Sequence, residues 1–360
     1  MNTITSHEIL YVEIYSPMAK SLAFWHTNAL GFTMIARYDE RSKVSYVLTN
    51  NQVCLVLTST YPTSASNGDP EINSFVSTNY CGVKRIALNV PNVKTEFDKS
   101  VANGAVPIKS PKISKDEFGE IEEAAIKLYD NNEIVFINRD RYTGIFKPDY
   151  HPVKGTTKTP LLKSIDHIAS EVRLNETAFW TNYLTNTIGT KLVQSISRSP
   201  ENRTGMILKV NQSADRNLTL VIAEPESYTA ESKVQQNVQT FGPGIHHLAF
   251  STDDIMSAIE KMKSNDVEFV SFPDSYYTLL RNNQDFKGFD IDALQSHGIL
   301  IDKEDDTYLL QKFIKPISDR PFFLYELVQR VNGYKGFALK NINVLKKAEE
   351  MEVMPIPGKV

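Results

Sequence analysis

The segment CGVKRIAL, residues 81–88, recurs later in the chain as PGIHHLAF, residues 243–250, and each copy leads into a helical pattern. A second pair of segments, LAFW at 22–25 and TAFW at 177–180, contains both tryptophans of the protein. A short strand-like run precedes each member of this second pair, and another follows it. The repeats therefore predict two similar halves, each made of two strand-helix-strands modules.

Four modules follow from these repeats, and they open near Ile9, Val83, Ile165 and Ile245. Alternating apolar runs at 53–57, 133–137, 218–222 and 322–328 supply later strands of the modules. The polar stretch from 147 to 160, rich in proline and lysine, is predicted to link the halves. We expect an N-terminal domain at 1–146 and a C-terminal domain at 161–360, both of mixed α+β structure.

The composition favours a globular protein that acts on a small molecule. The chain has 360 residues, 41% of them hydrophobic, and a net charge of -4, so no large basic field is available for nucleic acid or an anionic membrane. The N-terminus lacks a signal-peptide pattern and no segment is apolar enough to span a bilayer, which predicts a cytoplasmic protein. The sequence leaves open whether it forms a homo-oligomer.

The chain contains two cysteines, Cys54 and Cys81, the first within an apolar strand-like run and the second before a glycine. Two such residues provide neither a disulfide framework nor a cysteine-rich metal site. We expect both thiols to be buried or without a chemical role. Any metal must therefore be held by histidine and carboxylate side chains.

Comparison of the two halves identifies candidate metal ligands in the second half alone. Three residues that can bind a metal lie opposite residues that cannot or rarely do: His167 opposite Tyr11, His247 opposite Arg85, and Glu326 opposite Val135. Two imidazoles and one carboxylate on one face hold Fe(II) and leave positions open for substrate and oxygen. Taken singly, each residue also fits an ordinary core or surface position. Together, at matching module positions, they predict an iron site.

His246 lies next to one of these candidate ligands. Because neighbouring residues of a strand face opposite sides of the sheet, His246 is expected to point away from the iron. The alternative is that it supports the ligand from behind.

An ordered series of motifs resembles the 4-hydroxyphenylpyruvate dioxygenase and 4-hydroxymandelate synthase family of the vicinal oxygen chelate superfamily. In the second half the motifs are residues 242–250, 267–270, 273, 276–277, 298–302, 308–313, 319–321, 326, 329–330, 336–337 and 341–342. In the first half, residues 11–13, 52–58 and 121–129 also resemble the family. The resemblance implies two domains of paired βαβββ modules, with a C-terminal helix over the active site. Asn341, Ile342, Leu345 and Ala348 have the spacing of that helix.

The resemblance also implies a reaction. In the family, a 2-oxo acid chelates Fe(II) through its carboxylate and keto oxygens, and dioxygen attacks the keto carbon. Carbon dioxide is released, and either the aromatic ring or the benzylic carbon is hydroxylated. The expected partners are therefore an aromatic 2-oxo acid, such as 4-hydroxyphenylpyruvate, and O2.

Particular pocket residues follow from the same resemblance. It assigns Gln311 and Asn341 to catalysis, and it places around the substrate Leu208, Ala223, Gln311, Phe313, Leu324 and Ile342. Homogentisate-forming relatives carry Phe and mandelate synthases Ile at position 342, which favours benzylic hydroxylation. Leu208, Ala223 and His246 replace a serine, an asparagine and a glutamine of the family. A site without these polar groups is expected to discriminate poorly in favour of a phenol.

Three other functions stay open at this point. A different 2-oxo acid would suit the altered pocket positions. An extradiol dioxygenase would use the same fold and ligands, although residues 319–321 and 341–342 resemble the keto-acid branch. A metal-free ligand-binding protein is the third alternative, because paired modules of this superfamily also bind ligands without a metal.

Overall fold

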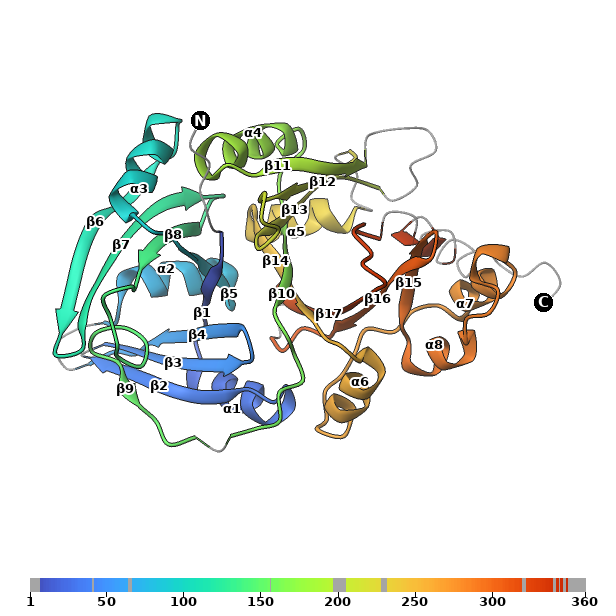
Figure 1. Ribbon diagram of the computed structural model, residues 1–360, viewed down its shortest axis with the longest axis horizontal. Helices are drawn as coiled ribbons and strands as arrows, with labels where there is room; N and C mark the ends of the chain where they lie inside the picture. Colours follow the sequence, from blue (N-terminus) through green and yellow to red (C-terminus); the bar gives the residue numbers. More distant parts are fainter. Residues whose placement is uncertain are drawn as a thin grey trace.

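A computed structural model describes residues 7–40, 42–63, 67–155, 157–196, 205–227, 232–318 and 322–338, together with 341, 342, 344, 345 and 348. The described chain forms two large mixed sheets, built from its first and second halves (Figure 1). The α+β prediction is confirmed, and each half contains two βαβββ modules as the repeats indicated.

The first sheet has nine strands in the order β6-β7-β8-β5-β1-β4-β3-β2-β9. The elements of this half are β1 (Ile9–Tyr15), α1 (Ala19–Ala29), β2 (Thr33–Glu40), β3 (Lys43–Asn50), β4 (Val53–Thr60), α2 (Pro70–Asn79), β5 (Gly82–Asn89), α3 (Val93–Ala102), β6 (Pro107–Asp116), β7 (Gly119–Leu128), β8 (Asn132–Asn138) and β9 (His151–Pro152). The short strand β9 comes from the stretch predicted as a linker and pairs with β2 at the edge of the sheet.

The second sheet has eight strands in the order β11-β12-β13-β10-β14-β17-β16-β15. Its half contains β10 (Ile165–Glu171), α4 (Thr177–Ile188), β11 (Lys191–Ile196), β12 (Met206–Gln212), β13 (Thr219–Pro225), α5 (Lys233–Phe241), β14 (Gly244–Ser251), α6 (Ile255–Lys263), α7 (Asp274–Arg281), a 3-10 turn η1 (Gln284–Phe286), α8 (Ile291–His297), β15 (Leu300–Glu304), β16 (Thr307–Ile314) and β17 (Leu324–Val331).

The central strands of the two sheets pair in the same way. In the first sheet β1 lies antiparallel to β5, and each is parallel to the last strand of its own module. In the second sheet β10, β14, β13 and β17 repeat this arrangement. The helices that follow β5 and β14 also begin alike, because Asn92 and Asp254 each accept a hydrogen bond from a backbone N–H of the first helical turn. Equivalent residues of the repeat therefore occupy equivalent places.

A contact between the halves reaches the strand that carries Glu326. His26 of α1 is fully buried, and its Nε2 lies 2.7 Å from the hydroxyl of Tyr325 in β17. Trp25 stacks on the same tyrosine at 6.5 Å between ring centres. Burial lowers the pKa of His26 to about 4, so this histidine stays neutral and acts as a packing group. The first half thus supports the strand next to a candidate ligand.

Some predicted segments lie only partly within the described residues. In the predicted C-terminal helix, Asn341, Ile342, Leu345 and Ala348 are helical, whereas the intervening residues 343, 346 and 347 are not described. The motif at 319–321 also lies outside the described residues.

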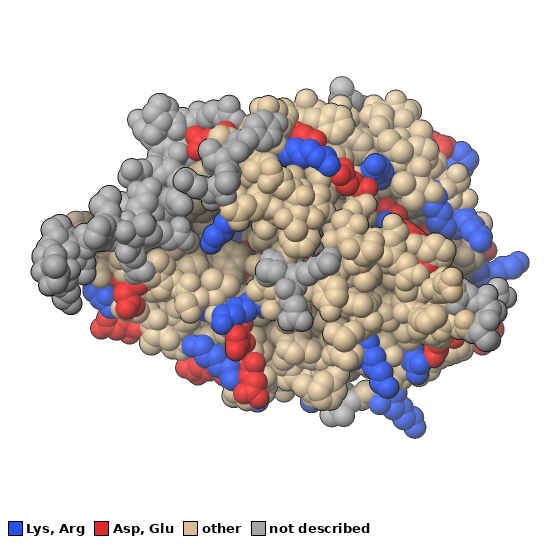
Figure 2. All heavy atoms as spheres, turned by 180° about the vertical axis from the view of Figure 1, so that it is seen from behind, with Lys and Arg blue, Asp and Glu red and all other residues tan. Residues whose placement is uncertain are grey.

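Charged side chains are mixed on the surface. On the face in Figure 2, acidic and basic residues of the described chain alternate and do not gather into a broad area of one sign. This distribution agrees with the nearly balanced composition. Within the described part of the chain, none of the helices combines the length and apolar character needed to cross a bilayer.

Candidate active site

The three predicted ligands meet on the inner strands of the second sheet. His167 of β10 and Glu326 of β17 both pair with Ala249 of β14, from opposite sides, and His247 lies two residues before Ala249. Nε2 of His167 and Nε2 of His247 each lie 3.2 Å from Oε2 of Glu326. One ligand atom of each residue falls within 4.8 Å of the others, a suitable arrangement for a metal ion.

The buried carboxylate of this site requires a positive charge beside it. Glu326 is 1% exposed, and although burial alone would raise its pKa, His167 and His247 lower it to about 2. Burial likewise disfavours charge on His167, yet the carboxylates of Glu326 and Asp166 raise its pKa to about 9. Without a metal, a proton on His167 balances the buried carboxylate. A divalent ion would replace that proton, so the donor set fits a metal such as Fe(II).

Each histidine of the candidate metal site is oriented through its other ring nitrogen. Nδ1 of His167 lies 2.8 Å from Oδ1 of Asp166, whose two oxygens accept hydrogen bonds of 2.7 and 2.8 Å from Arg330. Arg330 holds the pKa of Asp166 well below its usual range despite burial, so the carboxylate stays ionised. This pair fixes the imidazole with Nε2 directed at the site.

His246 performs the corresponding task for His247. Their Nδ1 atoms lie 2.9 Å apart. The pairing of β10 with β14 shifts register between Ala169 and Ser170, so His246 has no paired residue in β10. This irregularity interrupts the regular alternation of side chains between the two faces of β14. The expectation that His246 faces away from the iron is therefore wrong, and the supporting role is the one the geometry favours.

We expect Asp166→Asn to lower the affinity of the protein for Fe(II) about 10- to 100-fold, because supporting hydrogen bonds of metal ligands carry effects of that size. Titration of the metal-free variant with Fe(II) under anaerobic conditions measures the change. Asp253→Asn is the matched control, since Asp253 has an 82% exposed side chain that pairs with Lys163. Equal affinities of the two variants would show that Asp166 does not orient the ligand.

The three candidate ligands line a cavity of about 280 Å³. Its wall contains five of the six predicted substrate residues, namely Leu208, Ala223, Gln311, Phe313 and Ile342, together with Asn341, which the resemblance assigned to catalysis. The remaining predicted residue, Leu324, pairs with His247 in the sheet but does not line the cavity. Apolar side chains dominate the wall, which suits a substrate with an apolar body.

A chain of hydrogen bonds connects the C-terminal segment with the site. Nε2 of Gln311 donates to Oε1 of Glu326 at 2.7 Å, which leaves Oε2 of the carboxylate to face the histidines. Nδ2 of Asn341 donates to Gln311 at 3.4 Å, and the hydroxyl of Tyr276 donates to Oδ1 of Asn341 at 2.5 Å. Gln311 and Asn341 thus act together on a candidate ligand.

Sequence reasoning assigned no role to several residues of the site. Asp166 adjoins a ligand in the chain, which was the available signal, but its partner Arg330 is 164 residues away. Tyr276 belonged to a recognised motif without an assigned role. Glu171 had no signal other than its place four residues after His167 on the same face of a strand.

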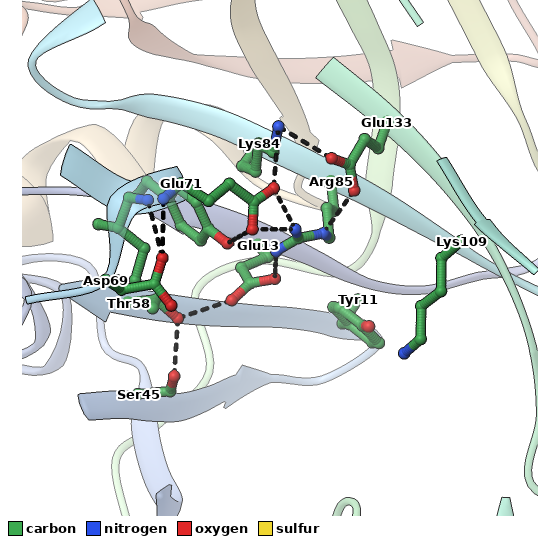
Figure 3. Close-up of polar contacts among 12 residues, drawn as sticks. Tyr11, Glu13, Ser45, Thr58, Asp69, Glu71, Lys84, Arg85, Lys109 and Glu133 are labelled. Atoms are coloured by element: carbon green, nitrogen blue, oxygen red, sulfur yellow. Dashed lines mark hydrogen bonds and ion pairs between the residues drawn. The ribbon is translucent and has the colours of Figure 1, made fainter. Parts of the chain in front are cut away.

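The first sheet fills the equivalent place with an ionic cluster (Figure 3). The cluster is centred on Arg85, the counterpart of His247, and contains Glu13, Glu71, Glu133 and Lys84. Arg85 donates to Glu133 at 2.7 Å, to Glu13 at 2.9 Å and to both oxygens of Glu71 at 2.6 and 2.8 Å. A guanidinium therefore supplies here the positive charge that a metal would supply in the second sheet.

The cluster predicts a pH dependence of stability. Burial alone would raise the pKa of Glu13, but Arg85, Lys43, Lys147 and a hydrogen bond from Thr58 lower it to about 2. Because the folded value lies below the unfolded value, the stabilisation is present above about pH 4.5 and is lost as the pH falls towards 2. Urea unfolding of the wild type at a series of pH values measures this loss.

The matched comparison uses Glu13→Gln. This variant is expected to lose less stability than the wild type between pH 4.5 and 2, since it lacks the titrating group. Parallel curves for the two proteins would contradict the assignment.

The fold and the site define a class of protein. Residues 164–308 match the family model of the Glyoxalase/Bleomycin resistance protein/Dioxygenase superfamily. The structure is similar to that of a triple mutant of 4-hydroxymandelate synthase from Streptomyces coelicolor, with a TM-score of 0.82 and 23% identity, over 96% of this chain and 99% of that one. The protein therefore has the paired βαβββ modules of the vicinal oxygen chelate fold.

Full-length relatives narrow the class to a family. The chain is 30% identical to 4-hydroxyphenylpyruvate dioxygenase of Tetrahymena thermophila over 93% of this chain and 87% of that protein. It is 29% identical to the protein of that name from Yarrowia lipolytica, over 95% and 91% of the two chains. The chain belongs to the 4-hydroxyphenylpyruvate dioxygenase family and is a dioxygenase of that family.

Proposed function

We propose that this protein is an Fe(II)-dependent dioxygenase that oxidatively decarboxylates and hydroxylates an aromatic 2-oxo acid such as 4-hydroxyphenylpyruvate. The observation that carries the proposal is the convergence of His167, His247 and Glu326 in the wall of a largely apolar cavity. Residues 161–360 would form the catalytic domain and residues 1–146 a domain without metal, because the equivalent place there holds Arg85.

The three ligands would occupy one face of the ion. Bound Fe(II) supplies a Lewis-acidic centre with open positions for the 2-oxo acid and O2. Asp166 and His246 keep the two Nε2 atoms directed at the ion, as their hydrogen bonds to the ring nitrogens indicate. Gln311 holds Glu326 through Oε1, so the other carboxylate oxygen remains for the metal.

The cavity wall would orient the substrate and exclude water. Phe313 and Phe337 lie beside His247 and His167, with ring centres 5.6 and 5.9 Å apart, and are placed to contact an aromatic ring. Asn341 and Ile342 bring the C-terminal segment to the same cavity. A water-poor site protects a reactive oxidant from side reactions.

Ile342 supports benzylic rather than ring hydroxylation. It packs against the cluster of Ala169, Leu208, Val210 and Val221 and lines the cavity. Isoleucine occupies less space than phenylalanine, so the substrate can shift and present its benzylic carbon to the oxidant. We therefore propose 4-hydroxymandelate as the product from 4-hydroxyphenylpyruvate, with homogentisate as the alternative.

One experiment tests the function. The purified protein is loaded with Fe(II) and given 4-hydroxyphenylpyruvate under oxygen, while O2 uptake, released carbon dioxide and the aromatic product are measured. Equal consumption of O2 and release of carbon dioxide, with a hydroxylated product, is the expected result. Absence of O2 uptake with every 2-oxo acid offered would refute the proposal.

The other functions predict different outcomes of the same assay. A different 2-oxo acid as natural substrate would appear as much faster turnover of that acid. An extradiol dioxygenase would cleave a catechol without release of carbon dioxide. A metal-free binding protein would take up no iron, and His167→Ala would leave its ligand binding unchanged.

A further inference from the structure

The cavity contains a buried carboxyl group that the proposed reaction does not use. Glu171 lies in the cavity wall and is 7% exposed. Its Oε2 has no hydrogen-bond partner in the described structure. Desolvation of a carboxyl group costs several kcal/mol unless a partner compensates for it. Glu171 is thus a group that a ligand in the cavity would satisfy.

Glu171 lines the same cavity as the candidate ligands but lies farther along β10 than His167. It is four residues beyond His167 on the same face of β10, which places the two Cα atoms roughly 13 Å apart along the strand. The sheet neighbour of Glu171 in β13 is Ala223, and the neighbour of Ala223 in β12 is Leu208. These two side chains offer no hydrogen bonds to a substrate. Two polar side chains lie close to Glu171: Nε2 of His246 is 3.9 Å from Oε1, and Asn237 forms a side-chain hydrogen bond with the carboxyl group.

The repeat provides an internal control for this interpretation. Tyr15 is the counterpart of Glu171 in the first sheet. Each of the two residues belongs to the last pair between its own strand and the parallel strand beside it, which is β4 for Tyr15 and β13 for Glu171. The hydroxyl of Tyr15 bonds to Glu71 and Arg85, so the equivalent polar group there is satisfied within the protein. In the second sheet the corresponding group faces a cavity instead.

We propose that Glu171, assisted by His246, binds the end of the substrate farthest from the metal and selects aromatic 2-oxo acids whose ring carries a hydrogen-bond donor. This inference rests on the proposed function. A phenol hydroxyl would donate its hydrogen to Oε2 of Glu171, and a ring without a donor would leave that oxygen unpaired. Leu208 and Ala223 stand where the family has polar residues, but selection for a phenol is retained because Glu171 supplies a polar group from a different strand.

The preference is measurable with three substrates. We expect kcat/KM for 4-hydroxyphenylpyruvate to exceed that for phenylpyruvate and 4-methoxyphenylpyruvate by about 10- to 100-fold, because a buried acceptor left without a partner costs about 1–3 kcal/mol. Both weaker substrates keep the 2-oxo acid and the ring, so the comparison isolates the donor. A ratio near one in the wild type would overturn the inference.

Two variants test whether Glu171 causes this substrate preference. Glu171→Leu is expected to bring the ratio of 4-hydroxyphenylpyruvate to phenylpyruvate close to one, mainly through a higher KM for the hydroxylated acid. Glu171→Gln retains an acceptor oxygen and should keep part of the ratio. Glu224→Gln is the matched control: Glu224 is 4% exposed in the neighbouring strand but bonds to the backbone N–H of Thr177, so the ratio should be that of the wild type.

The assay separates failure of this inference from failure of the proposed function. O2 uptake with all three acids and no change of the ratio in Glu171→Leu would refute the role of Glu171 alone. If no acid supports O2 uptake, the proposed function fails, and calorimetric titration of the Fe(II)-loaded protein under anaerobic conditions still decides whether the phenol binds more tightly. Should Glu171→Leu not fold, the wild type and Glu171→Gln provide the same comparison.

Discussion

Replacement of Glu326 by alanine is expected to abolish stable binding of Fe(II) and, with it, oxidation of the 2-oxo acid. Four ligands of a structural zinc ion contribute roughly 10–16 kcal/mol, so one ligand contributes about 3 kcal/mol, or a factor of about a hundred to a thousand in affinity. Glu326 is also the single carboxylate among the three convergent donors. Anaerobic titration with Fe(II) and O2 uptake with 4-hydroxyphenylpyruvate measure the two losses.

A control separates ligand loss from general damage to the protein. Glu268→Ala removes a carboxylate of the same half whose side chain is 74% exposed and paired with Lys315. This variant is expected to bind iron and oxidise substrate like the wild type. Retention of tight iron binding by Glu326→Ala would exclude Glu326 as a ligand and would leave His167 and His247 without their proposed partner.

The second large effect is expected on the stability of the first half. Arg85→Met should lower the free energy of unfolding by about 3–5 kcal/mol, because removal of one partner leaves buried charges uncompensated. Glu13 and Glu133, which pair with Arg85, are 6% and 4% exposed. Methionine keeps much of the apolar stem, so the loss reports mainly on the charge. Urea unfolding followed by circular dichroism measures it.

The matched control for this prediction is Arg37→Met. Arg37 forms an ion pair with Asp39, but its side chain is 46% exposed, and surface pairs contribute less than about 1 kcal/mol. Similar small losses in both variants would mean that the cluster around Arg85 does not stabilise the fold. Iron binding should persist in Arg85→Met molecules that remain folded, since the ligands lie in the other sheet.

The two sheets share one architecture but balance their buried carboxylates in two different ways. In both sheets, polar side chains of the inner strands meet in a buried place that requires a positive charge. The first sheet satisfies this requirement with Arg85, which is covalently part of the chain. The second sheet presents three donors to an ion and keeps a cavity beside them.

Much of the architecture was predictable from the sequence because it depends on local patterns. The module predicted to open near Ile9 begins with β1, and the helical pattern predicted after residues 243–250 is α6, with Asp254 as its N-cap. The repeat supplied the equivalence of His167, His247 and Glu326 with Tyr11, Arg85 and Val135. The pairing registers of the two sheets agree with this equivalence.

The sequence by itself thus determined the modular fold, the family and the three candidate ligands, since alternation along a strand and repetition along the chain are encoded in neighbouring residues. Only the tertiary structure decided the rest of the site. The register shift that turns His246 towards His247, the Asp166–Arg330 pair and the exposure of Glu171 to the cavity all depend on partners from other strands. Such contacts arise from sheet pairing between distant segments, and local periodicity carries no information about them.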